Sequence, residues 1–206
     1  MGRKLLVMYR RLHGVEAKMS SSPRSHILQA AEMLFYGNGI RAVGIDRLVE
    51  AANVAKATLY RHFSSKDLLI IAYLDQRHSR VVSDFTAAMA ESDDPFDQVT
   101  SIFRDLHSKA SVPGFRGCAF ALAVAECGDI DGVAETASKH KAFVRGIFGR
   151  IASAVRGDAT SLALRMAILY EGAIATMAIE RNPEIAITAR DCCLDLIERQ
   201  RQTAFN

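Results

Sequence analysis

The sequence predicts an all-α protein of about nine helices. Three observations lead to this prediction. Gly and Pro are sparse, at 13 and 4 of 206 residues, so the chain is neither fibrous nor disordered. Strand-like alternation with hairpin turns is lacking. Hydrophobic residues, 50% of the chain, instead recur at helical spacing between breaks.

The charge is distributed unevenly. Residues 1–66 hold eleven Lys or Arg against four Asp or Glu, a balance of +7, and the remainder holds fifteen against nineteen, a balance of −4. A basic front and an acidic back indicate that the front meets a polyanion. The apolar run at 5–8 is too short for a secretory signal, and Arg165 and Glu171 interrupt the stretch 162–179, so we expect no membrane span.

The cysteines are Cys118, Cys127, Cys192 and Cys193, and none of them lies at CxxC or metal-ligand spacing. We interpret them as reduced thiols of a cytosolic protein, packed as small hydrophobes. One redox-sensing thiol is the alternative. No cofactor and no metal site are predicted.

The first helix is expected after a flexible basic arm, residues 1–22. This arm either adds minor-groove or phosphate contacts or is an upstream extension, with Met19 as the true start. Pro23 suits the first position of a helix. The sequence Gly37-Asn38-Gly39 then ends that helix.

Residues 43–69 predict two short helices joined by a tight turn, followed by the start of a third. The apolar positions of the first recur at i, i+3, i+4 and i+7: Ile45, Leu48, Val49 and Ala52. Val54 follows in the turn. Leu59 and Phe63, four residues apart, share one face of the second helix.

The other face of that second helix carries Lys56, Thr58, Tyr60, Arg61 and His62. Cations suit phosphates, hydroxyls suit phosphates or base edges, and a ring suits a sugar or a thymine methyl group. The face is therefore chemically suited to a DNA groove. A solvated face on an ordinary helical hairpin is the alternative.

A long helix is expected to begin at a Ser64 cap, with Asp67 reaching back to it, and to run to about Glu91. Asp94 and Pro95 mark a restart. Apolar residues at helical spacing predict three further helices. The first covers 96–106, the second is short and buried and covers 118–125, and the third is long, covers 133–155 and ends at Gly157.

The last two helices are expected over 161–180 and 184–202. The first of them is apolar almost all round and rich in Ala and Gly, so every side has to be covered. A second copy of the chain is the simplest cover, which predicts a homodimer through 161–180 and 184–202. A central helix in a monomer is the alternative.

This order of elements resembles the TetR-type (tetracycline-repressor-like) transcriptional regulators. The resemblance is specific at residues 55–69, AKATLYRHFSSKDLL, and extends through GIRAVGIDRLV at 39–49. GCAF at 117–120 and HKAFVR at 140–145 resemble segments in the bodies of one subset. The resemblance implies three parts: a basic arm at 1–22, a helix-turn-helix DNA-binding domain at 23–68, and a ligand-binding and dimerisation domain at 69–206.

Two positions depart from the pattern of the family. Many members have Gly in the turn where this chain has Asn53, which tolerates a left-handed backbone. Many have Ser at the cap of the second helix where this chain has Ala55. The start of that helix therefore depends on packing or on a DNA phosphate, since loss of such a cap costs about 1 kcal/mol.

The resemblance implies roles for particular residues. Residues that face base edges or the groove are Lys56, Ala57, Thr58 and Arg61. The DNA backbone is then fixed by Tyr60, His62 and Lys66, and Arg47 touches a phosphate. The alternatives are a solvent-facing side chain for Arg47 and Lys66 and a structural hydrogen bond within the motif for His62. The implied partners are double-stranded DNA with a pseudo-palindromic operator, a second copy of the chain and a small-molecule effector. The protein is then a repressor in the cytoplasm, associated with the nucleoid.

A small apolar or amphipathic effector in the body is expected to lower operator affinity. The candidate pocket residues combine apolar bulk with a few polar tips: Phe103, His107, Phe120, Met166, Tyr170 and Met177. Plain core is the alternative for the Phe and Met residues. The rival function is a regulator or architectural factor controlled by a protein partner, without a pocket. An enzyme is not expected, because no Ser/His/Asp set, HExxH motif or phosphate loop occurs.

Overall fold

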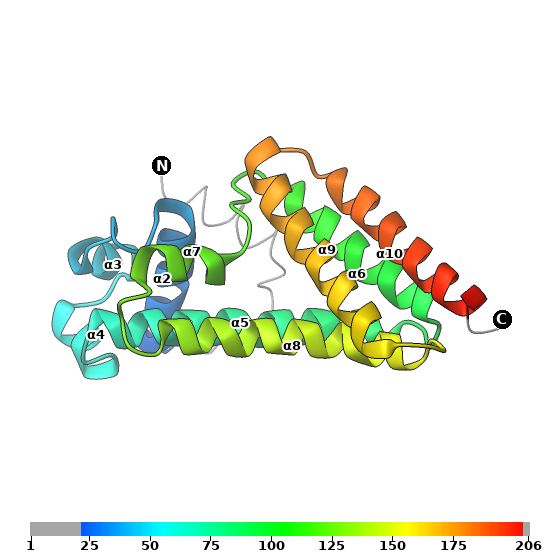
Figure 1. Cartoon of the computed structure of the whole chain (residues 1–206). Helices are drawn as coiled ribbons and strands as arrows, with labels where there is room; N and C mark the ends of the chain where they lie inside the picture. Colours follow the sequence, from blue (N-terminus) through cyan, green and yellow to red (C-terminus); the bar gives the residue numbers. More distant parts are fainter. Residues whose placement is uncertain (1–21, 204–206) are drawn as a thin grey trace. The chain divides into compact units, whose positions relative to one another are not determined.

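The computed structural model of the chain describes residues 22–203, which form nine α-helices and no strand (Figure 1). The all-α prediction is confirmed. The predicted basic arm, except for Ser22, lies outside the described residues, as do residues 204–206.

The described chain divides into two compact units. The head unit comprises the described residues up to Arg77 together with Ala119–Ala137, and the body unit comprises His78–Cys118 and the described residues from Ser138 onward. Compared with the expected domain at 23–68, the head unit also includes the first turns of α5 (Lys66–Ala90) and all of α7 (Ala119–Cys127).

In the head unit, α2 (Pro23–Asn38), α3 (Ile45–Ala52) and α4 (Lys56–His62) contact one another (Figure 1). α2 begins where the sequence predicts, because the Ser22 hydroxyl accepts a hydrogen bond from the Ser25 N–H. It ends at Gly39, whose φ of 93° suits a residue without a Cβ.

The three helices and the residues that follow them bury apolar side chains. Those at most 5% exposed include Ile27, Ala31, Phe35, Leu48, Ala52, Leu59, Phe63 and Leu69. Burying a Leu, Ile or Phe side chain contributes about 1.5–3 kcal/mol. This packing stabilises α4, since an isolated helix of seven residues does not form in water.

The start of α5 differs by one residue from the expectation. The Ser65 hydroxyl, not that of Ser64, accepts a hydrogen bond from the backbone N–H of Leu68, at 3.1 Å. The Ser65 carbonyl also accepts from the Leu69 N–H. Two adjacent serines are chemically equivalent as caps, so only the entry angle of the chain selects between them.

The short helix α7 is less buried than its sequence predicts. Ala119, Phe120, Ala123 and Cys127 are buried, which is one face of the helix. Val124, on another face, is 40% exposed. A continuous apolar run therefore predicts the helix but not its burial, because periodicity is lost when every position is apolar.

The body unit is built around α6 (Pro95–Ala110), α9 (Ala159–Glu180) and α10 (Ile185–Thr203), which pack together (Figure 1). The remainder of α5 and most of α8 (Val133–Ser153) complete it. The restart at Asp94 is confirmed, because its carboxylate accepts a hydrogen bond from the Phe96 N–H at 2.7 Å. Asp158 caps α9 in the same way.

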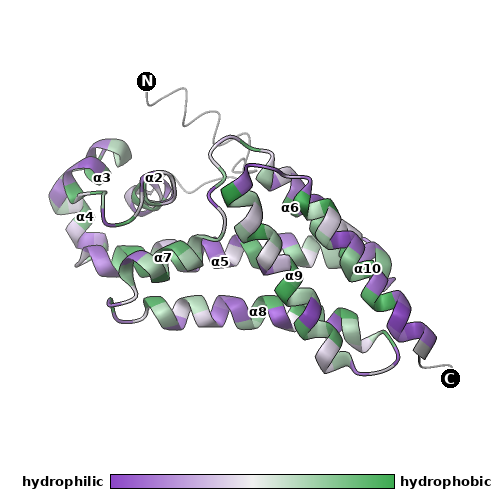
Figure 2. Ribbon diagram, turned by 45° about the horizontal axis from the view of Figure 1, so that its top comes forward, coloured by the Kyte–Doolittle hydropathy of each residue, from purple (hydrophilic) through white to green (hydrophobic). Residues whose placement is uncertain are grey.

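Hydrophobic residues recur along most of α9, whereas α10 ends in a hydrophilic segment (Figure 2). Three large apolar side chains of α9 are exposed: Leu164 at 52%, Ile168 at 61% and Ile179 at 81%. Among the described helices, α9 alone is long and apolar enough to cross a membrane by length and composition. The core helix of a soluble protein passes the same test.

Candidate functional site

The turn between α3 and α4 has the geometry that the sequence predicts. Asn53 ends α3 in the left-handed conformation, at φ 53° and ψ 50°. The N–H of Asn53 donates to the Glu50 carbonyl, and the N–H of Val54 donates to the Val49 carbonyl, both at 3.1 Å. These bonds occupy carbonyls that the end of a helix leaves unpaired, so the chain reverses into α4 within three residues.

The start of α4 has no side-chain cap. Ala55 takes the extended backbone of an N-cap, at φ −71° and ψ 149°, but has no side-chain acceptor. Only its carbonyl is used, by the N–H groups of Thr58 and Leu59. The helix is instead held through the buried side chains of Leu59 and Phe63.

The buried and exposed sides of α4 carry the residues that the sequence predicts for them. Leu59 and Phe63 are buried, while the side chains of α4 that remain exposed are mostly polar, and we call them the α4 face. Its members are Lys56, Ala57, Tyr60, Arg61 and His62, with Thr58 half-buried at its edge. Tyr60 is 43% exposed, which is unusual for a ring and leaves it available to a partner.

Two cations near this face have partners within the head unit. The Lys56 ammonium donates to the Asp46 carboxylate at 2.9 Å, and this hydrogen bond raises the pKa of Lys56. An Arg47 guanidinium nitrogen donates to the Asn38 side-chain oxygen at 3.1 Å. Both cations are surface groups, so a phosphate can compete for them at little free-energy cost.

Lys66 plays a structural role that the sequence does not reveal. Its ammonium donates to the backbone carbonyl of Ile40 at 2.8 Å and lies 5.9 Å from the centre of the Phe35 ring. An ammonium has three donors, so one bond to Ile40 leaves two for a phosphate.

Arg41 is a second residue that sequence reasoning missed. Its guanidinium donates to the Asp129 carboxylate and to the Glu126 backbone carbonyl, and its own N–H donates to the Glu126 carboxylate at 3.1 Å. These bonds tie the turn after α2 to the end of α7. The hydrogen bond from Arg41 lowers the pKa of Asp129. No short-range pattern could show a pair 88 positions apart.

The structure separates the six residues predicted for an effector pocket. Phe120 belongs to the head unit and is buried there. His107 lies in the body unit but its ring bonds to the Glu184 carboxylate at 3.0 Å. Three others lie in the body core at 0–1% exposure: Phe103, Met166 and Met177.

Tyr170 is the predicted pocket residue whose ring contacts three other aromatic rings. Its ring lies 5.6–5.8 Å, centre to centre, from the rings of Phe85, Phe103 and Phe148. Burial raises the pKa of its phenol far above the usual range, so the hydroxyl is neutral. It is the one half-buried member among the apolar residues predicted in the body.

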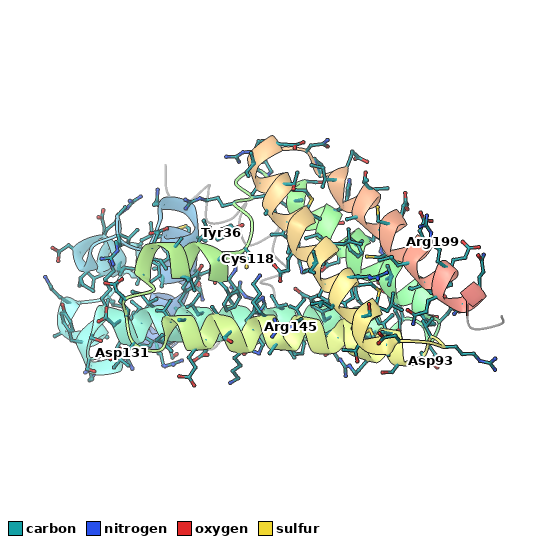
Figure 3. The ribbon with its side chains drawn as sticks, in the orientation of Figure 1. Tyr36, Asp93, Cys118, Asp131, Arg145 and Arg199 are labelled. Atoms are coloured by element: carbon teal, nitrogen blue, oxygen red, sulfur yellow. The ribbon has the colours of Figure 1, made fainter. Side chains whose placement is uncertain are left out.

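A cavity of about 530 Å³ opens elsewhere in the body unit, between α8 and α9. None of the predicted pocket residues lines it. Its walls carry small residues and two cations, Arg145 (Figure 3) and Arg150. Among the described residues, no group of three His, Cys, Asp or Glu side chains could hold a metal ion.

Known proteins are similar to this chain in sequence and in fold. Residues 27–73 match the family described as bacterial regulatory proteins, tetR family. The solved structure of a TetR-family transcriptional regulator from Streptomyces coelicolor is 34% identical, with a TM-score of 0.81, over 87% of this chain and 96% of that one.

Two curated relatives match about a third of this chain. The HTH-type transcriptional regulator TtgR of Pseudomonas putida is 35% identical over 36% of this chain, and the HTH-type transcriptional activator FasR of Mycolicibacterium smegmatis is 37% identical over 34%. The chain spans only 34% and 32% of their lengths, about a third of each protein.

Proposed function

Because the chain belongs to the TetR family of DNA-binding transcriptional regulators, we propose that it represses transcription from a pseudo-palindromic operator and that an effector in the body relieves this repression. The similar proteins are regulators, so the chain is a regulator and not an enzyme. Proteins of this family act in the cytoplasm, and association with the nucleoid is part of the proposal.

The observation that carries the proposal is the α4 face. It presents two cations, a hydroxylated ring and an imidazole from a helix that Leu59 and Phe63 hold in place. The face of such a helix fits the major groove of DNA. In the proposal, the base edges are contacted by Lys56, Ala57, Thr58 and Arg61. The phosphate backbone is contacted by Tyr60, His62, Lys66 and Arg47.

A homodimer through α9 and α10 completes the DNA-binding unit. One head reads too few bases to locate a genomic site, and two heads on a pseudo-palindrome overcome this. The support is the apolar stripe of α9: Leu164, Ile168 and Ile179 are more than half exposed in the single chain. A soluble protein rarely leaves a whole helix face of this kind uncovered.

The effector is placed beside Tyr170, among the aromatic rings of the body. An effector shifts operator affinity only by binding one state better than the other, by about 1–3 kcal/mol in typical cases. Phe103, Met166 and Met177 are closely packed, so a pocket there opens as the effector binds.

That close packing also favours a second candidate function. A body whose predicted pocket residues are fully buried suits a regulator or architectural factor that responds to a protein partner and has no small-molecule pocket. The two candidates share the head and differ only in what the body binds.

The test is a fluorescence-anisotropy titration with the DNA that flanks the protein's own gene. Wild-type protein should bind with an affinity that falls as salt rises. Tyr60→Ala and Arg61→Ala should each lose operator binding while keeping helicity and molecular mass. Lys139→Ala, at an exposed cation of the body, is the matched control and should bind like wild type.

Repeating the titration with a panel of small apolar and amphipathic compounds separates the two candidates. Release of DNA by one compound supports the effector proposal, and loss of that response in Tyr170→Phe or Tyr170→Ala places it at Tyr170. Unchanged DNA affinity in both α4 variants would overturn the assignment of the α4 face.

A further inference from the structure

The cavity between α8 and α9 contains two cations without partners. We call it the α8–α9 groove: residues of α8 between Arg145 and Ser153 form one wall, and residues of α9 between Ala159 and Leu164 form the other. Arg145 and Arg150 are both exposed, and neither has a hydrogen bond or an ion pair with any described residue. Two unpaired guanidiniums in one concave surface suit an occupant that carries carboxylates, because a guanidinium pairs with a carboxylate through two parallel hydrogen bonds.

Most other arginines of the body unit have partners inside the chain. Arg104, for example, donates to the Glu91 carboxylate at 2.7 Å. Apart from the two in the groove, Arg165 alone among the arginines of the described body has no such partner, and it follows Leu164 of the groove wall in sequence. The unpaired guanidiniums of the body unit therefore gather in the groove and beside it.

Two positions of the groove wall are bare backbone. Gly146 and Gly149 lie inside α8, where glycine destabilises a helix relative to alanine. Beyond the backbone of α8 itself, a Cβ at either position would meet no atom of the described chain within 4 Å. Packing within the chain thus does not require glycine here, whereas a missing Cβ lets another element approach closely. Both positions suit an occupant from outside the described chain.

The outward face of α10 carries the complementary charge. Asp195 and Glu198 are exposed, and within the described residues neither has a hydrogen bond or an ion pair. They are three positions apart, so they share one face of the helix. The described part of α10 exposes no large apolar side chain, and the helix ends in a hydrophilic segment (Figure 2). This face therefore offers a partner charge and not apolar surface.

The size of the groove matches about one turn of helix. A helical turn is about 5.4 Å long and 10–12 Å wide, and the cavity measures about 530 Å³. Asp195 and Glu198 lie within one turn of α10. The groove thus has room for both side chains.

The N-terminal arm is a poor occupant for the groove. Residues 1–21 hold five Lys or Arg against a single carboxylate, that of Glu16. Two arginines in the groove repel such a segment. The charge balance favours an acidic occupant, and α10 belongs to the dimer surface proposed above.

We propose that, in the homodimer, the carboxylates of Asp195 and Glu198 on each copy enter the α8–α9 groove of the other copy and pair with its two arginines. The inference rests on the proposed dimer through α9 and α10 and identifies the charged contacts that complete it. Leu164 belongs both to the groove wall and to the apolar stripe of α9, so the groove is continuous with the proposed interface. Twofold symmetry gives each dimer the contact twice.

The charged contact fixes the register of the two copies. Apolar burial is non-directional, so the stripe of α9 alone lets two helices slide along each other. Charges at defined positions allow one register and disfavour others, because a shift brings like charges together. In the proposed function, the spacing of the two heads on the operator depends on this register.

The first experiment measures the dimer dissociation constant of the full chain by analytical ultracentrifugation over a concentration series. Arg145→Glu combined with Arg150→Glu should raise it roughly tenfold, because like charges then face each other in both copies of the contact. Asp195→Arg combined with Glu198→Arg should raise it to a similar extent. Circular dichroism checks that both proteins keep the helix content of wild type.

The matched controls reverse unpaired charges elsewhere in the body unit. Lys139→Glu, on α8 outside the groove, and Asp93→Arg, before α6, should leave the dissociation constant unchanged. An unchanged constant in both groove and α10 variants would overturn the inference and leave the dimer to the apolar stripe alone. A wild type that stays monomeric would instead overturn the proposed dimer, and the inference with it.

The second experiment mixes the two charge-reversed proteins, one of them carrying a mass tag. One chain then has an acidic groove and an acidic α10, and the other has a basic groove and a basic α10. Both contacts of the mixed dimer are attractive, so native mass spectrometry should show heterodimers at concentrations at which each protein alone is monomeric. A mixture without this preference would overturn the inference, because the reversals would then act within one chain.

Gly146→Leu tests the groove without a change of charge. The new side chain enters open space and removes a helix glycine, so the melting temperature of the chain should stay the same or rise. The dimer dissociation constant should nevertheless rise severalfold, because the leucine occupies the groove. Lys139→Leu, on the same helix outside the groove, should leave the dimer intact. A Gly146→Leu dimer as tight as wild type would contradict entry of the second copy into the groove.

Discussion

The Lys66 ammonium bonds to the Ile40 carbonyl at 2.8 Å and thereby joins the first residue of α5 to the turn that follows α2. A lysine expected at a DNA phosphate is thus also part of the internal structure of the head unit. Its replacement should change folding as well as DNA affinity.

Lys66→Met should lower both the melting temperature and operator affinity. A hydrogen bond from a charged donor contributes about 1.5–3 kcal/mol, and one lost phosphate contact reduces the salt slope by about 1. Differential scanning calorimetry and salt-dependent titration measure the two effects. Lys66→Arg keeps the charge and serves as control. An unchanged melting temperature in Lys66→Met would show that the bond to Ile40 does not contribute to stability.

Ala55→Ser should stabilise the protein. The backbone at Ala55 already has N-cap geometry, so a hydroxyl there can accept from the N–H of Thr58, a gain of about 1 kcal/mol. For a chain of this size, that gain raises the melting temperature by roughly 2–4 °C. Ala57→Ser, inside the same helix, should give no gain. Equal shifts in both variants would contradict the capping argument.

Asp129→Asn should destabilise the protein near neutral pH and lose this effect in acid. The bond from Arg41 holds the pKa of Asp129 below its ordinary value of 3.8. A depressed folded-state pKa contributes stability above the unfolded value, and this is lost as the pH falls through the folded value.

The measurement compares melting temperatures of wild type and Asp129→Asn from neutral pH down to below 3.8. Their difference should shrink as the pH falls. Asp131→Asn, at an exposed carboxylate two positions away, should show no such convergence. A difference that stays constant over the whole range would mean that Arg41 and Asp129 are not paired in solution.

Ile168→Glu should convert the dimer to a monomer. Ile168 lies in the middle of the apolar stripe of α9 and is 61% exposed in one chain. In the proposed dimer both copies of Ile168 are buried, and each burial contributes less than the about 1.5–3 kcal/mol of a fully exposed side chain, because part of Ile168 is already covered in one chain. Analytical ultracentrifugation gives the mass. Leu68→Glu, at an apolar residue of the head that is 54% exposed, should remain dimeric. A dimer in Ile168→Glu would place the interface elsewhere.

The sequence predicts the head well because its signals are local. Leu59 and Phe63 are four positions apart and both turn inward, and Asn53 adopts the left-handed turn expected from its side chain. Helix periodicity and turn chemistry act over a few residues, so they can be read without knowledge of the tertiary structure.

The features that the sequence does not predict depend on contacts between residues far apart in the chain. Phe120 and Phe103 share a residue type and a helical setting, yet they lie in different units. The pairs of Arg41 with Asp129 and of Lys66 with Ile40 bring together residues that no spacing rule connects. Composition indicates that such residues are buried or charged but not which partner they meet.

The short α4 has a consequence for how such a protein can evolve or be redesigned. Of its seven residues only Leu59 is buried, so the positions proposed to read DNA barely overlap with the positions that fold the head. Substitutions at the outward positions leave the core untouched. If the α4 face reads the operator as proposed, exchanging a few of its side chains between paralogues changes operator preference on an unchanged scaffold.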